Sequence, residues 1–170
     1  AMTTETIDPF ARLREPFAAE FVGKLPKPLK KDAQKGKCKP PTERGDAPAW
    51  QDYFCGGYHG LPAVHLDYVG HAAVTGRLLE VDPSWTWEPL SLTPEGMPAL
   101  DKDGNLWIRL TVLGTTRLGV GDGANMKERI GDALRNAAMR FGVALDLWVK
   151  GHEEAVAAAS DEKPAPVEGP

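Results

Sequence analysis

The alternation of apolar and polar side chains predicts three β-strands in the middle of the chain. In the run LWIRLTV at 106–112, apolar residues occupy every second position, with polar or aromatic residues between them. A period of two places the two sets of side chains on opposite faces of a sheet. Gly114 permits a tight turn, and the run TTRLGV at 115–120 is then the returning strand. Near-alternating polarity at 85–92 predicts an earlier strand of the same sheet.

Helical spacing predicts a helix on either side of these strands in the sequence. From Asn125 to Lys150, apolar residues recur at steps of three and four, which packs one stripe of a helix onto a sheet. Asn125 or Asp122 can accept hydrogen bonds from the free amides at its start. A shorter run at 67–82 has the same spacing and ends before a proline. The pattern indicates an α+β fold, in which a twisted, hairpin-rich antiparallel sheet follows a short helix and carries a long one.

The two ends of the chain differ in composition from the segment between them. Residues 1–60 hold closely spaced prolines that exclude any long helix, and seven lysines against one aspartate between Lys24 and Pro41. Residues 151–170 combine proline, alanine and acidic side chains without apolar periodicity. We therefore expect a Pro/Lys-rich N-terminal arm at 1–60, a folded core at 61–150 and an acidic disordered tail at 151–170.

Composition narrows the class of protein. The chain has 170 residues, a formal net charge of −4 and 42% hydrophobic residues, which is typical of one globular domain with loose ends. Two cysteines cannot form a disulfide framework, so a reducing compartment is expected. Neither a secretory leader nor a run of about 18 apolar residues occurs, so we expect a cytoplasmic protein with no membrane partner.

Patterns of catalytic residues are missing from the sequence. Gly119, Gly121 and Gly123 precede a predicted helix, but no Lys-Ser or Lys-Thr follows them, so a glycine-rich strand-to-helix turn is the structural interpretation. Its alternative is a set of backbone amides that hold a DNA phosphate. No serine has the context of a nucleophile elbow. These features favour a binding or assembly protein over an enzyme, with no required cofactor.

One set of residues has the chemistry of a zinc site. Cys38, Cys55, His59 and His65 form a C-x16-C-x3-H-x5-H series, and two thiolates with two imidazoles are a tetrahedral zinc donor set. Zinc modules usually pair close cysteines, whereas these two lie far apart. The alternative is an exposed thiol, a buried thiol and surface histidines, so zinc stays open.

Basic residues on the predicted sheet and long helix are the remaining candidates for function. If these basic side chains lined one groove, they would bind a phosphate backbone regardless of its base sequence. Trp85, Trp87 or Trp107 could stack on the bases. The alternative for the helix is an ordinary solvated face, and for the tryptophans a place in the core. The basic candidates are Arg135, Lys127, Arg129, Arg140, Arg109, Arg117 and Lys102.

Three segments together resemble a known family. They are DYVGHAAVTGRLLEVDPSWTWEPL at 67–90, LWIRLTVLGTTRLGVGDG at 106–123 and MKERIGDALRNAAMRFGVALDLWV at 126–149. In order and spacing they resemble the DNA-binding core of the Rad fifty-two family of single-strand annealing proteins, in its bacteriophage and actinobacterial branch. The resemblance covers about half of the chain. Met139 departs from it, since the family often has an arginine there.

The resemblance implies a β-β-β-α core that assembles side by side into homo-oligomeric rings or helical arrays. Single-stranded DNA would lie in a basic groove and pair with a complementary strand without ATP, in homologous recombination and DNA repair. Arg135 falls on the family's basic position in the inner groove, and Lys102 lies near another. The setting implied is a bacterial host cell, with a single-strand binding protein or a phage exonuclease as further partners.

Two other classes of function compete with this hypothesis. An oligomeric adaptor or assembly protein would form oligomers without annealing DNA. A small zinc-binding protein would hold stoichiometric metal on its cysteines and histidines.

Overall fold

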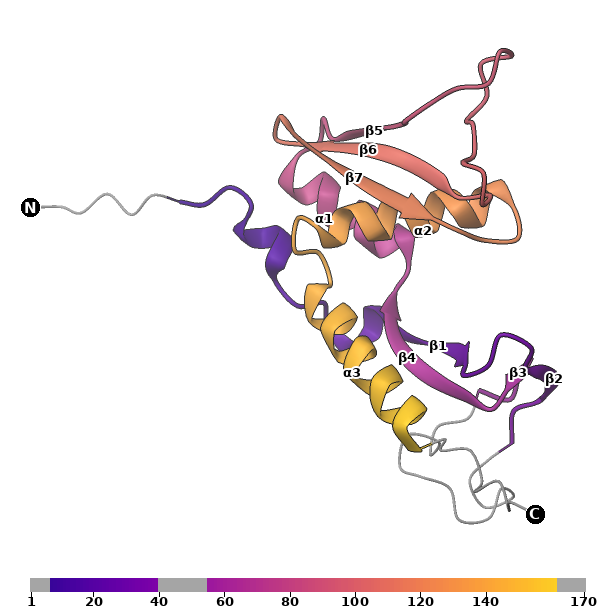
Figure 1. The fold of residues 1–170 in the computed structure, drawn as a ribbon. Helices are drawn as coiled ribbons and strands as arrows, with labels where there is room; N and C mark the ends of the chain where they lie inside the picture. Colours follow the sequence, from indigo (N-terminus) through magenta and orange to yellow (C-terminus); the bar gives the residue numbers. More distant parts are fainter. Residues whose placement is uncertain (1–6, 40–54, 162–170) are drawn as a thin grey trace, which may run out of the picture. The chain divides into compact units, whose positions relative to one another are not determined.

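The computed structural model describes residues 7–39 and 55–161. These residues form two compact units (Figure 1), which we describe separately. The first contains residues 7–22 and 69–145, and the second contains residues 23–39, 55–68 and 146–161. The boundaries of the units therefore differ from those of the expected arm, core and tail.

The first unit contains the predicted antiparallel sheet, in the order β5-β6-β7. Its strands are β5 (Thr86–Pro89), β6 (Leu106–Val112) and β7 (Thr115–Gly121). Strands β6 and β7 form a hairpin from the pair Leu106↔Gly121 to the pair Val112↔Thr115. Leu113 and Gly114 make the turn between them, with φ angles of 48° and 76°. Two residues of positive φ match the twist of the paired strands, so this hairpin is confirmed.

Two helices, α1 (His71–Val81) and α2 (Met126–Met139), lie on one side of this sheet (Figure 1). The apolar side chains of β6 that alternate toward them are all fully buried. Glycines bring β7 close to α2, because a Cβ on Gly119 would lie 2.4 Å from the Ala137 Cβ and one on Gly121 would lie 2.3 Å from the Ala133 nitrogen. The structure thus has the α+β class and the β-β-β-α order that we expected.

The prediction of one long helix from Asn125 to Lys150 is wrong, because a turn interrupts the helix. Helix α2 ends at Met139, and α3 (Leu145–Asp161) begins after a short turn. In this turn Gly142 has a φ of 93°, its amide donates to the Met139 carbonyl at 2.8 Å, and the Val143 amide donates to the Ala138 carbonyl at 3.1 Å. These two bonds form a Schellman C-cap, which ends a helix. The start of α2 is as predicted, since the Asn125 side chain accepts a hydrogen bond from the Glu128 amide.

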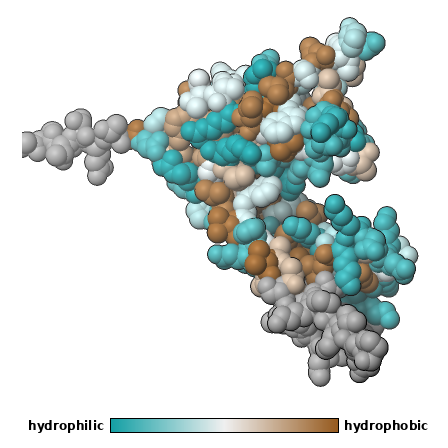
Figure 2. Space-filling model, in the orientation of Figure 1, coloured by the Kyte–Doolittle hydropathy of each residue, from teal (hydrophilic) through white to brown (hydrophobic). Residues whose placement is uncertain are grey.

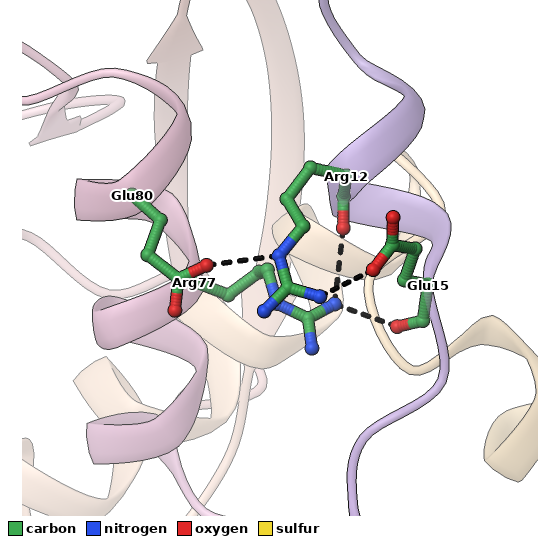
Figure 3. Close-up of polar contacts among 4 residues, drawn as sticks. All are labelled: Arg12, Glu15, Arg77 and Glu80. Atoms are coloured by element: carbon green, nitrogen blue, oxygen red, sulfur yellow. Dashed lines mark hydrogen bonds and ion pairs between the residues drawn. The ribbon is translucent and has the colours of Figure 1, made fainter.

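The segment around Leu13, near the start of the described residues, packs on the first unit instead of extending as an arm. Leu13, in the short helix η1 (Ala11–Arg14), is fully buried. Figure 3 shows how Arg77 of α1 holds this segment, with Nη1 donating to the carbonyls of Arg12 at 3.0 Å and Glu15 at 2.6 Å. The guanidinium also lies 4.1 Å from the centre of the Phe17 ring. Burial lowers the pKa of Arg77.

The second unit is built from two short strand pairs and α3. The pairs are β1 (Val22–Pro28) with β4 (Ala63–Val69), and β2 (Gln34–Lys37) with β3 (Tyr58–Leu61). A further short helix, η2 (Ala19–Phe21), precedes β1. Prolines excluded long helices from this segment but not strands, so the extended arm is wrong here. The helix predicted at 67–82 also starts late, because β4 continues to Val69.

Part of the predicted disordered tail is helical. Helix α3 reaches Asp161, and residues 162–170 lie outside the described part of the chain. The Asp67 carboxylate of β4 binds the Lys150 amine of α3 and the Lys24 amine of β1, each at 2.6 Å. These bonds, that from Lys150 foremost, lower the pKa of Asp67. The alanine-rich sequence of α3 favours a helix.

Candidate functional site

Three of the predicted basic residues gather where α2 begins. Arg129 donates from Nε to the Gly104 carbonyl at 3.0 Å, which joins the first turns of α2 to the 101–105 turn that carries Lys102. Lys102 and Lys127 are exposed, and neither amine has a hydrogen bond or ion pair with any described residue. Both can therefore meet an anion without breaking a contact with the described chain.

The 101–105 turn also orients the exposed indole of Trp107. The Asp101 carboxylate accepts from the amides of Asp103 and Asn105 and from the Trp107 Nε1, each at 2.9 Å. These bonds, led by that from the Asn105 amide, lower the pKa of Asp101. Trp107 is 37% exposed, on the sheet face opposite α2. Trp87 pairs with Leu110 and lies on the helix side, so of these two only Trp107 is placed to stack on a base.

Arg135, the basic residue that the resemblance favours most, already has an acidic partner. Its Nη2 lies 2.8 Å from Asp132 Oδ1, and its side chain is 20% exposed. Asp132 also accepts from the Asp122 amide at 3.1 Å. A phosphate at Arg135 would have to share or replace the bond to Asp132.

Two further arginines meet at the other end of α2. Arg117 donates from Nη1 to the Arg140 carbonyl at 2.7 Å, and its guanidinium lies 4.6 Å from the centre of the Phe141 ring. Arg140 donates to the Asn136 carbonyl at 2.9 Å. These contacts close the end of the helix, and both side chains stay exposed.

The seven residues do not line one groove as we expected. Arg109 pairs with Leu118 and Arg117 pairs with Leu110, so the two arginines lie on opposite faces of the sheet. Arg117 shares the face of α2, whereas Arg109 lies on the other face with Glu88, 3.9 Å away. The structure groups Lys102, Lys127 and Arg129 at one end of α2, and Arg117 and Arg140 at its other end.

The sheet face opposite the helices carries apolar and hydroxyl side chains. Leu90, Trp107 and Leu118 are 37%, 37% and 41% exposed. The hydroxyls of Thr111 and Thr116 lie 2.7 Å apart on neighbouring strands. This outer face therefore offers a mixed surface beside the guanidinium of Arg109.

The strongest concentration of positive charge lies in the second unit. Between residues 23 and 39 seven lysines stand against one aspartate, a balance of +6, and all seven are exposed. Figure 2 shows a hydrophilic surface over β1, β2 and β3. We call residues 24–39 the lysine-rich segment.

The cysteines and histidines of the sequence series meet in the same unit. Cys38 directly follows β2, Cys55 precedes β3, His59 lies in β3 and His65 in β4. One ligand atom from each lies within 4.8 Å of those of the other three, so the set could hold one metal ion. Cys38 Sγ is 3.8 Å from His65 Nε2, and Cys38 and His65 are 3% and 5% exposed. His65 is thus buried rather than on the surface.

Strand pairing explains why the wide spacing of the cysteines is compatible with one site. Lys37 pairs with Tyr58, and the Cys38 amide donates to the Gly57 carbonyl at 2.8 Å. The start of β3 therefore lies beside the end of β2. Cys55, which precedes β3, and His59, which lies in it, are thus close to Cys38. The spacing in the sequence gives only the separation of Cys38 and Cys55 along the chain. The pairing of β2 with β3 determines how far apart they lie in space.

Sequence reasoning missed two charged residues that organise the structure. Arg77 holds the N-terminal segment on α1, and Asp67 joins three elements of the second unit. The available signal for Arg77 was its place beside Leu78, in the apolar stripe of a predicted helix, where an unpaired charge would be costly.

Comparison of the chain with models of protein families, with curated protein sequences and with solved structures finds no match. Among the described residues, none of the helices has the length and apolar character needed to cross a membrane.

Proposed function

We propose that this protein binds single-stranded DNA and anneals complementary strands without ATP, as a homo-oligomer that acts in homologous recombination. The observation that carries the proposal is the order of three antiparallel strands followed directly by a helix packed on one face. This β-β-β-α arrangement is the one implied by the resemblance of residues 67–149 to the Rad fifty-two family. Partners such as a single-strand binding protein or an exonuclease belong to the same proposal.

The packing of β7 on α2 supports this assignment. Gly119 and Gly121 allow the helix backbone to approach the sheet so closely that a Cβ on either would clash. The glycine-rich run is therefore explained by packing, and a phosphate loop is not needed to account for it. The same run lies in the second of the three segments that carry the resemblance.

The distribution of charge agrees with binding to a phosphate backbone. Lys102 and Lys127 have no described acidic partner, and the lysine-rich segment adds seven exposed lysines, of which Lys24 already binds Asp67. Contacts of lysine with phosphate release counterions, so affinity should fall steeply with salt. Base stacking on Trp107 would add attraction that does not depend on sequence.

Equilibrium binding to a fluorescent oligothymidine at several salt concentrations tests the proposal. We expect Lys102→Ala and Lys127→Ala each to reduce the slope of log affinity against log salt by about 0.7, the value for one phosphate contact on a single strand. Ala72→Glu, at an exposed position in the first turn of α1, is the control because it lowers the net charge by the same amount. Unchanged slopes in both lysine variants would show that Lys102 and Lys127 do not contact phosphate. A parent protein with no affinity for the oligonucleotide would defeat the proposal.

An assembly role without annealing is the second candidate, and the outer sheet face favours it. Strands β5 and β7 are the edges of the described sheet, and Trp107 of β6 and Leu118 of β7 are partly exposed on its outer face. Edges and an apolar face can pair with further copies of the chain. Oligomers that bind no single-stranded DNA would favour this candidate.

A further inference from the structure

We propose that Cys38, Cys55, His59 and His65 bind one zinc ion, which joins β2, β3 and β4 in the second unit. The site lies outside the β-β-β-α core and is independent of the proposed annealing function. It is a structural site, in which four protein side chains coordinate the metal ion and no further molecule binds.

The geometry is already close to that of a bound metal. Ligand atoms at the usual zinc distances lie about 3.3–3.8 Å from one another in a tetrahedron. The four atoms here lie within 4.8 Å of one another, and Cys38 Sγ is 3.8 Å from His65 Nε2. Contraction of the widest pair by about 1.0–1.5 Å at most would therefore close the site. Four donors from four positions leave no open coordination position for a substrate.

Hydrogen bonding sets His59 in the tautomer that a metal needs. Its Nδ1 lies 2.9 Å from the Gly60 carbonyl, which can only accept, so Nδ1 carries the proton. The lone pair of the neutral ring is then on Nε2. That atom is buried and has no hydrogen-bond partner among the described residues. A carbonyl behind one imidazole nitrogen and a metal at the other is the usual arrangement of a ligating histidine.

A tight turn fixes the position of Cys55. The Gly57 amide donates to Cys55 Sγ at 3.3 Å, across Gly56, whose φ of 67° permits this turn. The turn directly precedes β3 and therefore holds the Cys55 sulfur close to His59.

The balance of charge explains how this set can be buried. Two cysteine thiols lose their protons to solvent when zinc binds, and the two neutral imidazoles lose none. One Zn²⁺ with two thiolates and two imidazoles therefore carries no net charge. Cys38 and His65, at 3% and 5% exposure, can surround such an ion without burying an unpaired charge. Sulfur and imidazole donors in a tetrahedron select zinc over magnesium or calcium.

Metal analysis of the full chain tests the proposal. The protein is stripped with a chelator under reducing conditions, and then titrated with zinc against a chromophoric chelator. We expect the parent protein to bind one equivalent of zinc, and Cys38→Ser and His59→Gln to bind it more than about 100-fold more weakly. Loss of a group that only hydrogen-bonds to a metal ligand already lowers metal affinity by about 10–100-fold. His152→Gln, on exposed α3 surface, is the control and should match the parent. A parent protein that binds no zinc, or Cys38→Ser with parental affinity, would overturn the proposal.

Two further measurements use the parent protein alone, so they do not require any variant to fold. Cobalt in place of zinc should give the intense visible bands of a tetrahedral site and a thiolate charge-transfer band; weak octahedral bands would contradict the assignment. Both thiols should resist a thiol reagent with zinc bound and react after chelation. Equal reactivity of the two thiols with and without zinc would also overturn it.

Discussion

The close approach of β7 to α2 can be tested by adding one methyl group at Gly121. In the structure its Cβ would lie 2.3 Å from both the Ala133 nitrogen and the Arg129 carbonyl oxygen. Ordinary contacts begin near 3.4 Å, so the helix must move by about 1 Å. Both neighbours are backbone atoms, and no side chain can rotate away. Overpacking of a core costs about 1–3 kcal/mol, and we expect Gly121→Ala to reach the upper end.

Chemical denaturation measures this cost directly. With a urea m-value of about 2 kcal/mol per molar, a loss of about 3 kcal/mol lowers the midpoint by roughly 1.5 M. Gly76→Ala is the matched control, because Gly76 lies inside α1, and outside its own turn of helix no atom of the described residues lies within 4 Å of the added Cβ. Alanine in an exposed helix should raise the stability by about 0.5–1 kcal/mol. A Gly121→Ala midpoint equal to that of the parent would refute the packing described for β7 and α2.

Two further predictions concern charged residues that act within a single unit, Arg77 in the first and Asp67 in the second. Arg77→Ala should lower the free energy of unfolding by about 2–3 kcal/mol, since two hydrogen bonds from a buried guanidinium are lost; Arg12→Ala, whose ion pairs are exposed, should have a much smaller effect in the same denaturation assay. The pKa of Asp67 is lowered in the folded state, so its stabilising contribution is complete above the unfolded pKa and is lost as pH falls through the folded value, below 3.8. The stability difference between the parent and Asp67→Asn should therefore be largest near neutral pH and shrink in acid, and a difference that does not vary with pH would contradict it.

Local signals were sufficient to predict the central hairpin and the start of α2. The period of two at 106–112, the turn at Gly114 and the cap at Asn125 each act within a few residues. The interruption at Gly142 was missed because the apolar period continues on both sides of it. A glycine with a φ of 93° ends the helix there, although the stripe of apolar residues runs on.

Pairing between distant segments could not be predicted from composition. Prolines and lysines at 22–37 indicated an extended arm, whereas β1 and β2 find partners in β4 and β3. The same non-local pairing brings Cys38 to Cys55, so the spacing of the cysteines was a poor guide to their distance. In each case the partner strand supplies the hydrogen bonds, and no local pattern specifies which strand that is.

The register of the β6–β7 hairpin excludes a single groove that holds both Arg109 and Arg117. A two-residue turn at Leu113 and Gly114 pairs Val112 with Thr115, and counting back pairs Arg109 with Leu118. Arg117 must then face the other side of the sheet from Arg109. Alternation along each strand follows from the register, and a shift of one residue exchanges the two faces.

The proposed annealing of single strands of DNA can be followed directly by fluorescence. Two complementary oligonucleotides, one carrying a fluorophore and the other a quencher, are mixed without ATP at rising protein concentration. We expect the protein to accelerate quenching several-fold over the spontaneous rate, a non-complementary pair to give no signal, and the active species to be an oligomer in a mass measurement. Quenching at the spontaneous rate, at concentrations where both strands are fully bound, would contradict it.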